Sequence, residues 1–437
     1  MNKTQPFKRI AWRACLLATI VSLLAVTVAL AASGDLDLTF DGDGMLTTDV
    51  SAAHPGQHDV VQAIAIQPAN GKILAAGYSY GASAADSNFA VTRYNTNGSP
   101  DPTFSGDGRL MTNFGGEDMA NEIAVQSNGK IVVAGYKCVN EICDAALARY
   151  NANGQLDITF SGDGKQITDF AGGDNGADGL AIQSNGKIVV AGWVSNGTGY
   201  DFAVYRYNAN GNLDNTFSKD GRVRISFGPG RQDSAADLAI QSDGKIVVAG
   251  YSSDLNYDNG NFAVARLNPN GTLDTTFSGD GRQTTNFGAD ERGFAMALQP
   301  DGRIVVLGTK YTATLRYFAL ARYNPNGGLD TTFNGTGKKV FSFTPVTFSY
   351  ASDLMIQPDG KIVVAGATDS YDFAVARLTS GGSLDATFSG DGKATVDFGG
   401  DEFGYAIALQ PSDGAYVIGG NITNGPQSDF ALACLLP

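Results

Sequence analysis

Carboxylates recur just before the apolar core of a repeated strand pattern, and these are the residues best placed to do chemistry. They are Glu122, Asp237 and Asp353, with Asp178 one residue before the matching position of another copy. Three converging carboxylates would hold a hard cation such as calcium, which prefers oxygen ligands. A pair of them would instead serve a glycosidase as acid and base. Solvated acids without a ligand are the simplest alternative.

Other reactive residue types form weaker patterns. His54 and His58 stand four apart, but Pro55 and Gly56 argue against a helix that would aim both at one metal. A recurring Gly-Asp-Gly step lacks the spaced carboxylates of an EF-hand loop, so we expect its aspartates to stabilise turns. Those aspartates are Asp43, Asp107, Asp163, Asp220, Asp280 and Asp391. No nucleophile elbow, phosphate loop or zinc signature occurs, which favours a non-catalytic protein over an enzyme.

Aromatic residues gather in segments whose length and content vary between copies of the repeat. Tyr and Trp combine apolar area with a polar group, which suits contact with a glycan or a protein. Packing of the segments against one another is the alternative role. The candidates for ligand contact are Tyr80, Tyr136, Trp193, Tyr200, Tyr257, Tyr311 and Tyr371.

A two-residue turn signal marks the repeat that must position these residues. Asn-Gly or Asp-Gly stands between two apolar runs seven times, with glycines 54 to 58 residues apart. These dipeptides tolerate the positive φ angles of a tight hairpin, so each copy has two antiparallel strands, A and B. The glycines are Gly71, Gly129, Gly186, Gly244, Gly302, Gly360 and Gly414.

The rest of each copy predicts two more strands. Strand C reads like Phe262–Leu267, and a second turn leads to Leu-Asp-x-Thr-Phe and a β-prone stretch that should contain strand D. Four antiparallel strands at this period are typical of a propeller blade. We therefore predict an all-β, seven-bladed β-propeller, with an open β-solenoid as the alternative. The segment Leu36–Phe40 would complete the last blade, and a ring would leave no exposed sheet edges.

The repeat resembles the bacterial delta-60 repeat family. The resemblance rests on Leu-Asp-x-Thr-Phe-Ser-Gly-Asp-Gly, on Asn-Gly-Lys-Ile-Val-Val-Ala-Gly and on Phe-Ala-Val-Ala-Arg-Tyr-Asn, and it covers nearly all of residues 32–437. It implies an exported propeller-type protein and no established activity.

Residues present in nearly every copy should serve folding. Strand C carries an Arg, and an Asp follows it eight residues later, as in Arg206 and Asp214. We predict an ion pair across each C–D turn; a turn-capping Asp and an Arg stacked on a ring form the alternative. Cys434 takes the Arg position of the last copy, so Asp37 would lack its partner.

The two faces of the predicted ring should differ. The A–B and C–D turns are short and nearly identical, whereas the B–C and D–A connections vary and hold the aromatic candidates. We call the face formed by the B–C and D–A connections the variable face. Function should lie there.

The first 31 residues predict a signal peptide, with a basic start, an apolar stretch and a small-residue cleavage site near Ala31. A retained membrane anchor is the alternative. Residues 32–437 would then form the propeller domain of a secreted, periplasmic or cell-surface protein, with no membrane span and no partner subunit. Cleavage would leave 26 positive against 44 negative residues, a net charge of −18 that disfavours nucleic acid.

Export would permit a disulfide between Cys138 and Cys143, and we expect Cys434 to be a buried thiol. The leading hypothesis is an exported, non-catalytic propeller that binds a glycan or protein through its variable face. An exported carbohydrate-active enzyme with channel-mouth carboxylates, or a purely structural surface protein, is the alternative. No cofactor is expected, apart from calcium at the low-ranked site of Glu122, Asp237 and Asp353.

Overall fold

The computed structural model describes residues 31–50, 58–80, 86–170, 172–343, 348–425 and 427–437. Within them, residues 32–437 form one compact unit. The predicted signal segment up to residue 30, and His54, lie outside the described residues. No helix in the described part of the chain is long and apolar enough to cross a membrane.

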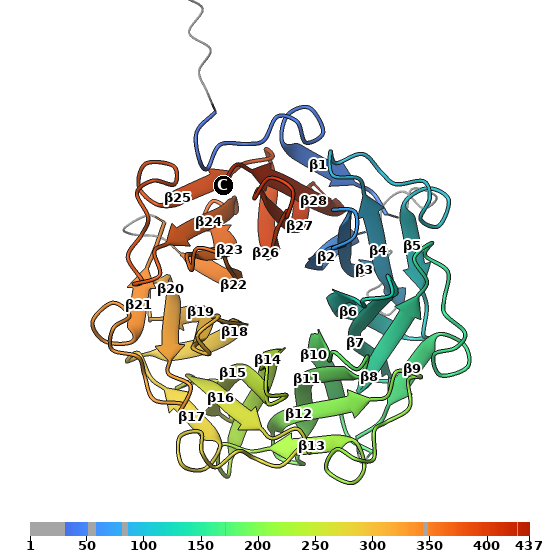
Figure 1. Ribbon diagram of the computed structural model, residues 1–437, viewed down its shortest axis with the longest axis vertical. Coiled ribbons are helices and arrows are strands. Elements are labelled where there is room, and N and C mark those ends of the chain that lie inside the picture. Colours follow the sequence, from blue (N-terminus) through green and yellow to red (C-terminus); the bar gives the residue numbers. More distant parts are fainter. Residues whose placement is uncertain (1–30, 51–57, 81–85, 171, 344–347, 426) are drawn as a thin grey trace, which may run out of the picture. The chain divides into compact units, whose positions relative to one another are not determined.

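The described residues form β-strands and no α-helix, in seven four-stranded blades (Figure 1). Blades one and two are β2 (His58–Ile66), β3 (Ile73–Tyr80), β4 (Asn88–Tyr94), β5 (Arg109–Thr112) and β6 (Glu117–Val125), β7 (Ile131–Val139), β8 (Ile142–Tyr150), β9 (Lys165–Thr168). Blades three and four are β10 (Asn175–Ile182), β11 (Ile188–Ser195), β12 (Tyr200–Tyr207), β13 (Arg222–Ile225) and β14 (Arg231–Ile240), β15 (Ile246–Asp254), β16 (Asn261–Leu267), β17 (Arg282–Thr285). Blades five and six are β18 (Asp290–Leu298), β19 (Ile304–Tyr311), β20 (Arg316–Tyr323), β21 (Lys338–Phe341) and β22 (Ser349–Ile356), β23 (Ile362–Thr368), β24 (Phe373–Leu378), β25 (Lys393–Val396).

Blade seven draws its strands from both ends of the unit. It contains β26 (Asp401–Leu409), β27 (Tyr416–Asn424) and β28 (Gln427–Leu435), and its outer strand is β1 (Met45–Thr48), which pairs antiparallel with β28. One parallel bridge, His58 to Ser428, links blades one and seven. In Figure 1 the sheets surround an open centre, with strand A of each blade innermost and strand D outermost. The predicted all-β propeller with seven four-stranded blades is confirmed, and the N-terminal segment completes blade seven through β1.

The hydrophobic core lies between neighbouring blades. Consecutive residues of strands B and C are fully buried, as in Ile73–Ala76, because both faces of these strands are covered. One cluster joins Phe89 and Phe104 of blade one to Ile123 and Val133 of blade two. The Phe of each Leu-Asp-x-Thr-Phe motif is at most 1% exposed. The shared motif therefore supplies the contact that holds each blade to the next.

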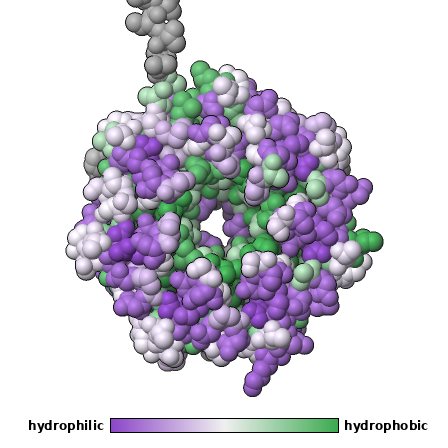
Figure 2. Space-filling model, in the orientation of Figure 1, coloured by the Kyte–Doolittle hydropathy of each residue, from purple (hydrophilic) through white to green (hydrophobic). Residues whose placement is uncertain are grey.

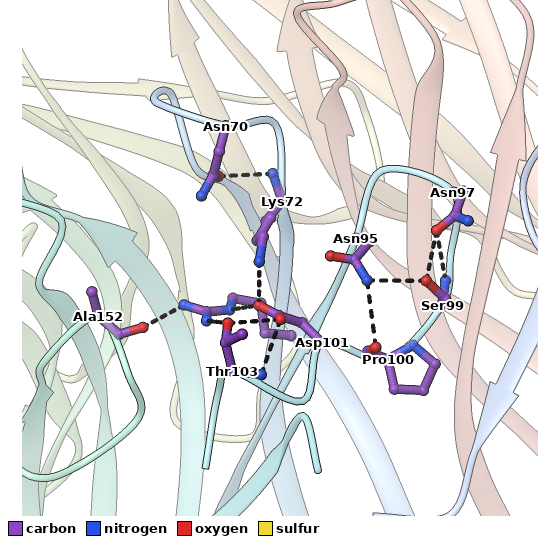
Figure 3. A network of polar contacts seen from close by, with 10 residues as sticks. Asn70, Lys72, Asn95, Asn97, Ser99, Pro100, Asp101, Thr103 and Ala152 are labelled. Carbon is purple, nitrogen blue, oxygen red and sulfur yellow. Dashed lines mark hydrogen bonds and ion pairs between the residues drawn. The ribbon is translucent and has the colours of Figure 1, made fainter. Parts of the chain in front are cut away.

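The predicted ion pair forms in six blades, with Arg Nε 2.6–2.8 Å from Asp Oδ2. The alternative geometry forms too, since each Arg lies 4.5–5.0 Å over the motif Phe and each Asp caps its turn. Figure 3 shows blade one, where Lys72 also binds Asp101 at 2.6 Å. In the same blade, Arg93 donates to the Ala152 carbonyl of blade two at 2.5 Å. Blade seven has Cys434 in the Arg position and Ala415 in the Lys position.

Candidate ligand-binding cavity

A β-bulge interrupts strand A of every blade at the same place. The register shifts between residues such as Ala120 and Glu122, which leaves one extra residue on the innermost strand. A bulge turns two successive side chains toward the same side of a strand. The extra residues are Gln62, Asn121, Asp178, Ala236, Phe294, Ser352 and Tyr405.

The bulge explains a glycine in strand B that the sequence repeats without variation. A Cβ on Gly250 would collide with the carbonyl oxygen of Ser234 at the bulge. The same collision with a bulge carbonyl recurs in the other six blades, at Gly77, Gly135, Gly192, Gly308, Gly366 and Gly420. A lone glycine within a strand pattern is a sign of a bulge, and it could have revealed this feature from sequence.

The seven bulges wall a cavity of about 650 Å³ at the channel mouth on the variable face. All seven extra bulge residues line it, together with Glu122, Asp237 and Asp353. Its aromatic walls are Tyr136, Trp193, Phe294, Tyr311, Tyr350, Phe403 and Tyr405. Figure 2 shows the central opening, with hydrophobic residues around it and hydrophilic residues over the outer part of the view.

The acids of the cavity are tied to the backbone of the bulges. Asp237 accepts the N–H of Leu238 at 2.6 Å and that of Met296, on the next blade, at 2.7 Å. Asp353 repeats this arrangement with Leu354 at 2.7 Å and Ile407 at 2.8 Å. These carboxylates therefore bridge adjacent blades along the channel wall.

Glu122 and Asp178 are held by different contacts. Glu122 accepts the N–H of Ile123 at 2.9 Å, and Asp178 accepts from the Asn121 amide at 2.8 Å. Each of these two acids keeps a partly exposed side chain.

Burial raises the pKa of all four acids. It raises the pKa of Asp178 to about 7 against the hydrogen bond from Asn121. It also raises the pKa of Asp353 to about 7 and that of Asp237 to about 6, each against backbone hydrogen bonds. Burial lifts the pKa of Glu122 well above its usual range, and the charges of Asp237 and Asp353 add to the effect. The cavity thus holds protonatable acids at neutral pH.

A second, smaller hollow opens between blades three and four; we call it the side hollow. Its volume is about 200 Å³. Trp193 lines both the side hollow and the central cavity, so the two are adjacent. The side hollow is lined by Trp193, Tyr200, Gln232, Asp233, Ser234, Tyr251 and Tyr257.

The structure brings five of the seven aromatic candidates to these two spaces. Tyr136, Trp193 and Tyr311 line the cavity, and Tyr200 and Tyr257 join Trp193 in the side hollow. Tyr80 lies outside both and stacks on His58, with ring centroids 4.8 Å apart. Tyr371 also lies outside both, and packs against Phe403 at 5.0 Å. The sequence analysis did not predict that Phe294 lines the cavity, because only the bulge places this side chain there.

Glu122, Asp237 and Asp353 all line the cavity, and calcium binding by the three stays a prediction. Within the described ranges, the carboxylate groups close enough to share an ion are Asp49, Asp59 and Asp429, and Asp372, Asp397 and Glu402. The bulge N–H groups hold Asp237 and Asp353 along the wall through both oxygens of each carboxylate. The Gly-Asp-Gly aspartates accept N–H groups two residues ahead, as Asp220 does from Arg222 at 3.0 Å, and so stabilise turns.

Cys138 and Cys143 are joined by a disulfide across the β7–β8 pair. The turn beyond it consists of Asn140 and Glu141, both with positive φ. The bridge thus closes the B–C hairpin of blade two. Cys434 is a buried free thiol, and burial raises its pKa to about 12.

The fold and cavity define a seven-bladed β-propeller with a ligand-sized space at one mouth of its channel. A family model described as "Domain of unknown function (DUF5122) beta-propeller" matches the chain seven times, over more than half its length. The chain belongs to this family. The matched residues are 69–104, 126–160, 183–217, 241–277, 299–333, 357–388 and 412–437.

No curated protein matches the chain. Solved structures give distant likenesses. Polysaccharide lyase Uly1 is 11% identical with a TM-score of 0.48, over 89% of this chain and 91% of that one. A Penicillium chrysogenum alpha-L-arabinanase is 13% identical with a TM-score of 0.46, over 72% and 91%. Drosophila Semaphorin 1b is 9% identical with a TM-score of 0.46, over 92% and 88%. Likenesses at this level carry no argument about function.

Proposed function

We propose that this chain is an exported, non-catalytic β-propeller that binds a glycan in the channel-mouth cavity of its variable face. The observation that carries the proposal is the cavity itself, where rings and hydrogen-bonding side chains from all seven blades meet in about 650 Å³. Sugars offer apolar ring faces and many hydroxyl groups, and a concave aromatic site with a few polar groups suits both. The delta-60 motifs of the repeat agree with export and name no activity.

Thermal unfolding of the protein against a panel of soluble polysaccharides tests the proposal. A ligand that binds only the folded state raises the midpoint, and the rise saturates with concentration. We expect Trp193→Ala combined with Tyr311→Ala to abolish the rise, because both rings line the cavity. Tyr80→Ala, outside the cavity, is the control and should leave the rise intact. No shift with any polysaccharide would refute glycan binding.

A glycan-cleaving enzyme is the second candidate, and the raised pKa of Glu122 favours it. A carboxyl group whose pKa is raised by burial is better suited to act as a general acid. If the protein hydrolyses a bound glycan, Glu122→Gln should remove the activity while the variant remains folded and still binds the glycan. Activity retained in that variant would exclude Glu122 as the acid.

A further inference from the structure

The side hollow is lined on several sides by aromatic rings held in place by protein contacts. Trp193 and Tyr200 meet edge to face, with centroids 5.2 Å apart and ring planes at 78°. The Tyr200 N–H donates to the Gln232 side chain at 3.1 Å, which fixes the start of β12. The Tyr257 N–H donates to the Asp254 carbonyl at 3.0 Å, which closes the loop that carries its ring. The rings are therefore arranged before any ligand binds.

A buried carboxylate also lines this hollow. The Asp233 side chain is 0% exposed, and its Oδ2 accepts the Phe227 N–H at 2.8 Å. Its Oδ1 is buried as well, and hydrogen bonds from the Phe227 N–H and the Ser252 side chain oppose the effect of burial on the pKa of this carboxyl group. These donors are neutral, and no Lys, Arg or His is among the described residues that line the hollow. A positively charged ligand group would supply a countercharge there.

The tyrosines of the hollow already attract one cation. The Arg292 guanidinium lies 5.6 Å from the Tyr251 ring and 6.0 Å from the Tyr257 ring. Arg292 is not among the residues that line the hollow. Its guanidinium lies 3.5 Å from the Asp290 carboxylate. Aromatic faces attract cations through the ring quadrupole, most strongly where water is excluded.

The neighbouring cavity offers no competing cation. Four carboxyl groups line it, and its described lining includes no Lys, Arg or His. A cation near Trp193 would therefore meet carboxyl groups and no positive side chain in that cavity.

We propose that the side hollow binds an organic ammonium group, methylated so that it fits between Trp193, Tyr200, Tyr251 and Tyr257. Asp233 supplies the countercharge. A volume of about 200 Å³ is several times that of one water, about 30 Å³ in the liquid, and suits a small head group. The site is distinct from the central cavity, so glycan binding and ammonium binding can each fail alone.

Three small probes of nearly one shape separate charge from apolar contact. They are choline, dimethylaminoethanol and 3,3-dimethylbutanol, which carry a fixed cation, a protonated amine and a neutral carbon centre. Trp193 is the sole tryptophan of residues 32–437, so its fluorescence reports occupancy. We expect choline and dimethylaminoethanol to bind at least about tenfold more tightly than 3,3-dimethylbutanol. Equal affinity for choline and dimethylbutanol would overturn the proposal.

A matched pair of tyrosines controls for folding. Tyr257 and Tyr371 both lie in B–C loops, both have φ of 62°, and they are 40% and 39% exposed. Tyr257→Leu should weaken choline binding about tenfold, and Tyr257→Phe should restore it because the ring face returns. Tyr371→Leu should leave choline affinity unchanged. Unaltered binding in Tyr257→Leu would refute the aromatic cage.

The source of the ammonium group is settled by two further probes. A peptide with trimethyllysine should bind like choline, whereas glycine betaine should bind more weakly because its carboxylate meets the acids of the site. Betaine binding as tight as choline would contradict the role of Asp233. If choline binds and no polysaccharide does, the glycan proposal alone fails; the reverse pattern refutes the ammonium site alone.

Discussion

The repeated ion pair can be tested in blade three with a double-mutant cycle. Arg206 Nε lies 2.6 Å from Asp214 Oδ2, and the two side chains are 6% and 3% exposed. Arg206 also donates to the Pro269 carbonyl of the next blade at 2.5 Å and lies 4.5 Å over Phe217. Burial alone would raise the pKa of Asp214, but hydrogen bonds from Lys187 and Thr216 and the charge of Arg206 lower it below its usual range.

The variants are Arg206→Met, Asp214→Asn and the double variant. Asp214→Asn leaves the buried Arg206 without its countercharge, which costs about 3–5 kcal/mol of unfolding free energy. Arg206→Met should cost less, because Lys187 still pairs with Asp214 at 2.7 Å. Once one partner is gone, loss of the second costs less, so we expect a coupling of about 1–3 kcal/mol. Urea unfolding followed by circular dichroism measures each free energy of unfolding.

The exposed pair Arg282 and Asp280 is the control for this cycle. Their atoms approach to 3.0 Å, but the side chains are 36% and 55% exposed, so the same cycle should give about 0.5 kcal/mol or less. If the effects of Arg206→Met and Asp214→Asn add, with a coupling energy no larger than that of the control pair, the pairing argument is refuted.

Three further outcomes follow from the same contacts. Burial raises the pKa of Asp353 to about 7 in the folded state, whereas the same group in the unfolded chain titrates near about 4. The thermal unfolding midpoint should therefore fall as pH rises from about 4 to 7, and Asp353→Asn should make this fall less steep. Asp37→Asn should lower the free energy of unfolding in urea by about 1 kcal/mol or less. Blade seven lacks the Arg and the Lys that pair with this Asp in other blades, and an amide oxygen can still accept from Thr39. A loss as large as that of Asp214→Asn would contradict this reasoning. Gly250→Ala should lower the free energy of unfolding by about 1–3 kcal/mol or more in the same assay, because the new Cβ would collide with the Ser234 carbonyl oxygen. Gly381→Ala should be tolerated, since a Cβ there would lie 3.8 Å from the nearest atom.

The repeat made most of the fold predictable. The same motifs recur at a nearly constant spacing: the turn dipeptide, strand C and Leu-Asp-x-Thr-Phe. A prediction of the strands in one repeat therefore applied to all seven. The limits of strand D could not be predicted, because its four residues, such as Arg109–Thr112, follow a turn and lack a distinct apolar pattern. Only pairing with strand C defines them.

The candidate site was predictable in place but not in detail. Variation between copies located the variable face and most of the aromatic residues that line its hollows. The contacts of Asp237 and Asp353 could not be predicted, because each accepts a backbone N–H from the bulge of the next blade. The side hollow joins Trp193 and Tyr251 from different blades, a contact that depends on how blades pack rather than on any one repeat.

The bulge separates what this fold repeats from what it varies. Its geometry is the same in all seven blades, and the strand B glycine that permits it never changes. The two residues that it turns toward the channel differ in every blade: Gln62 and Ala63, Asn121 and Glu122, Asp178 and Gly179, Ala236 and Asp237, Phe294 and Ala295, Ser352 and Asp353, Tyr405 and Ala406. A purely structural bulge could use one pair of residues throughout, as the Arg–Asp network nearly does. Fixed geometry with varied chemistry around one cavity is what an asymmetric ligand requires, and it is why we place function at the channel mouth.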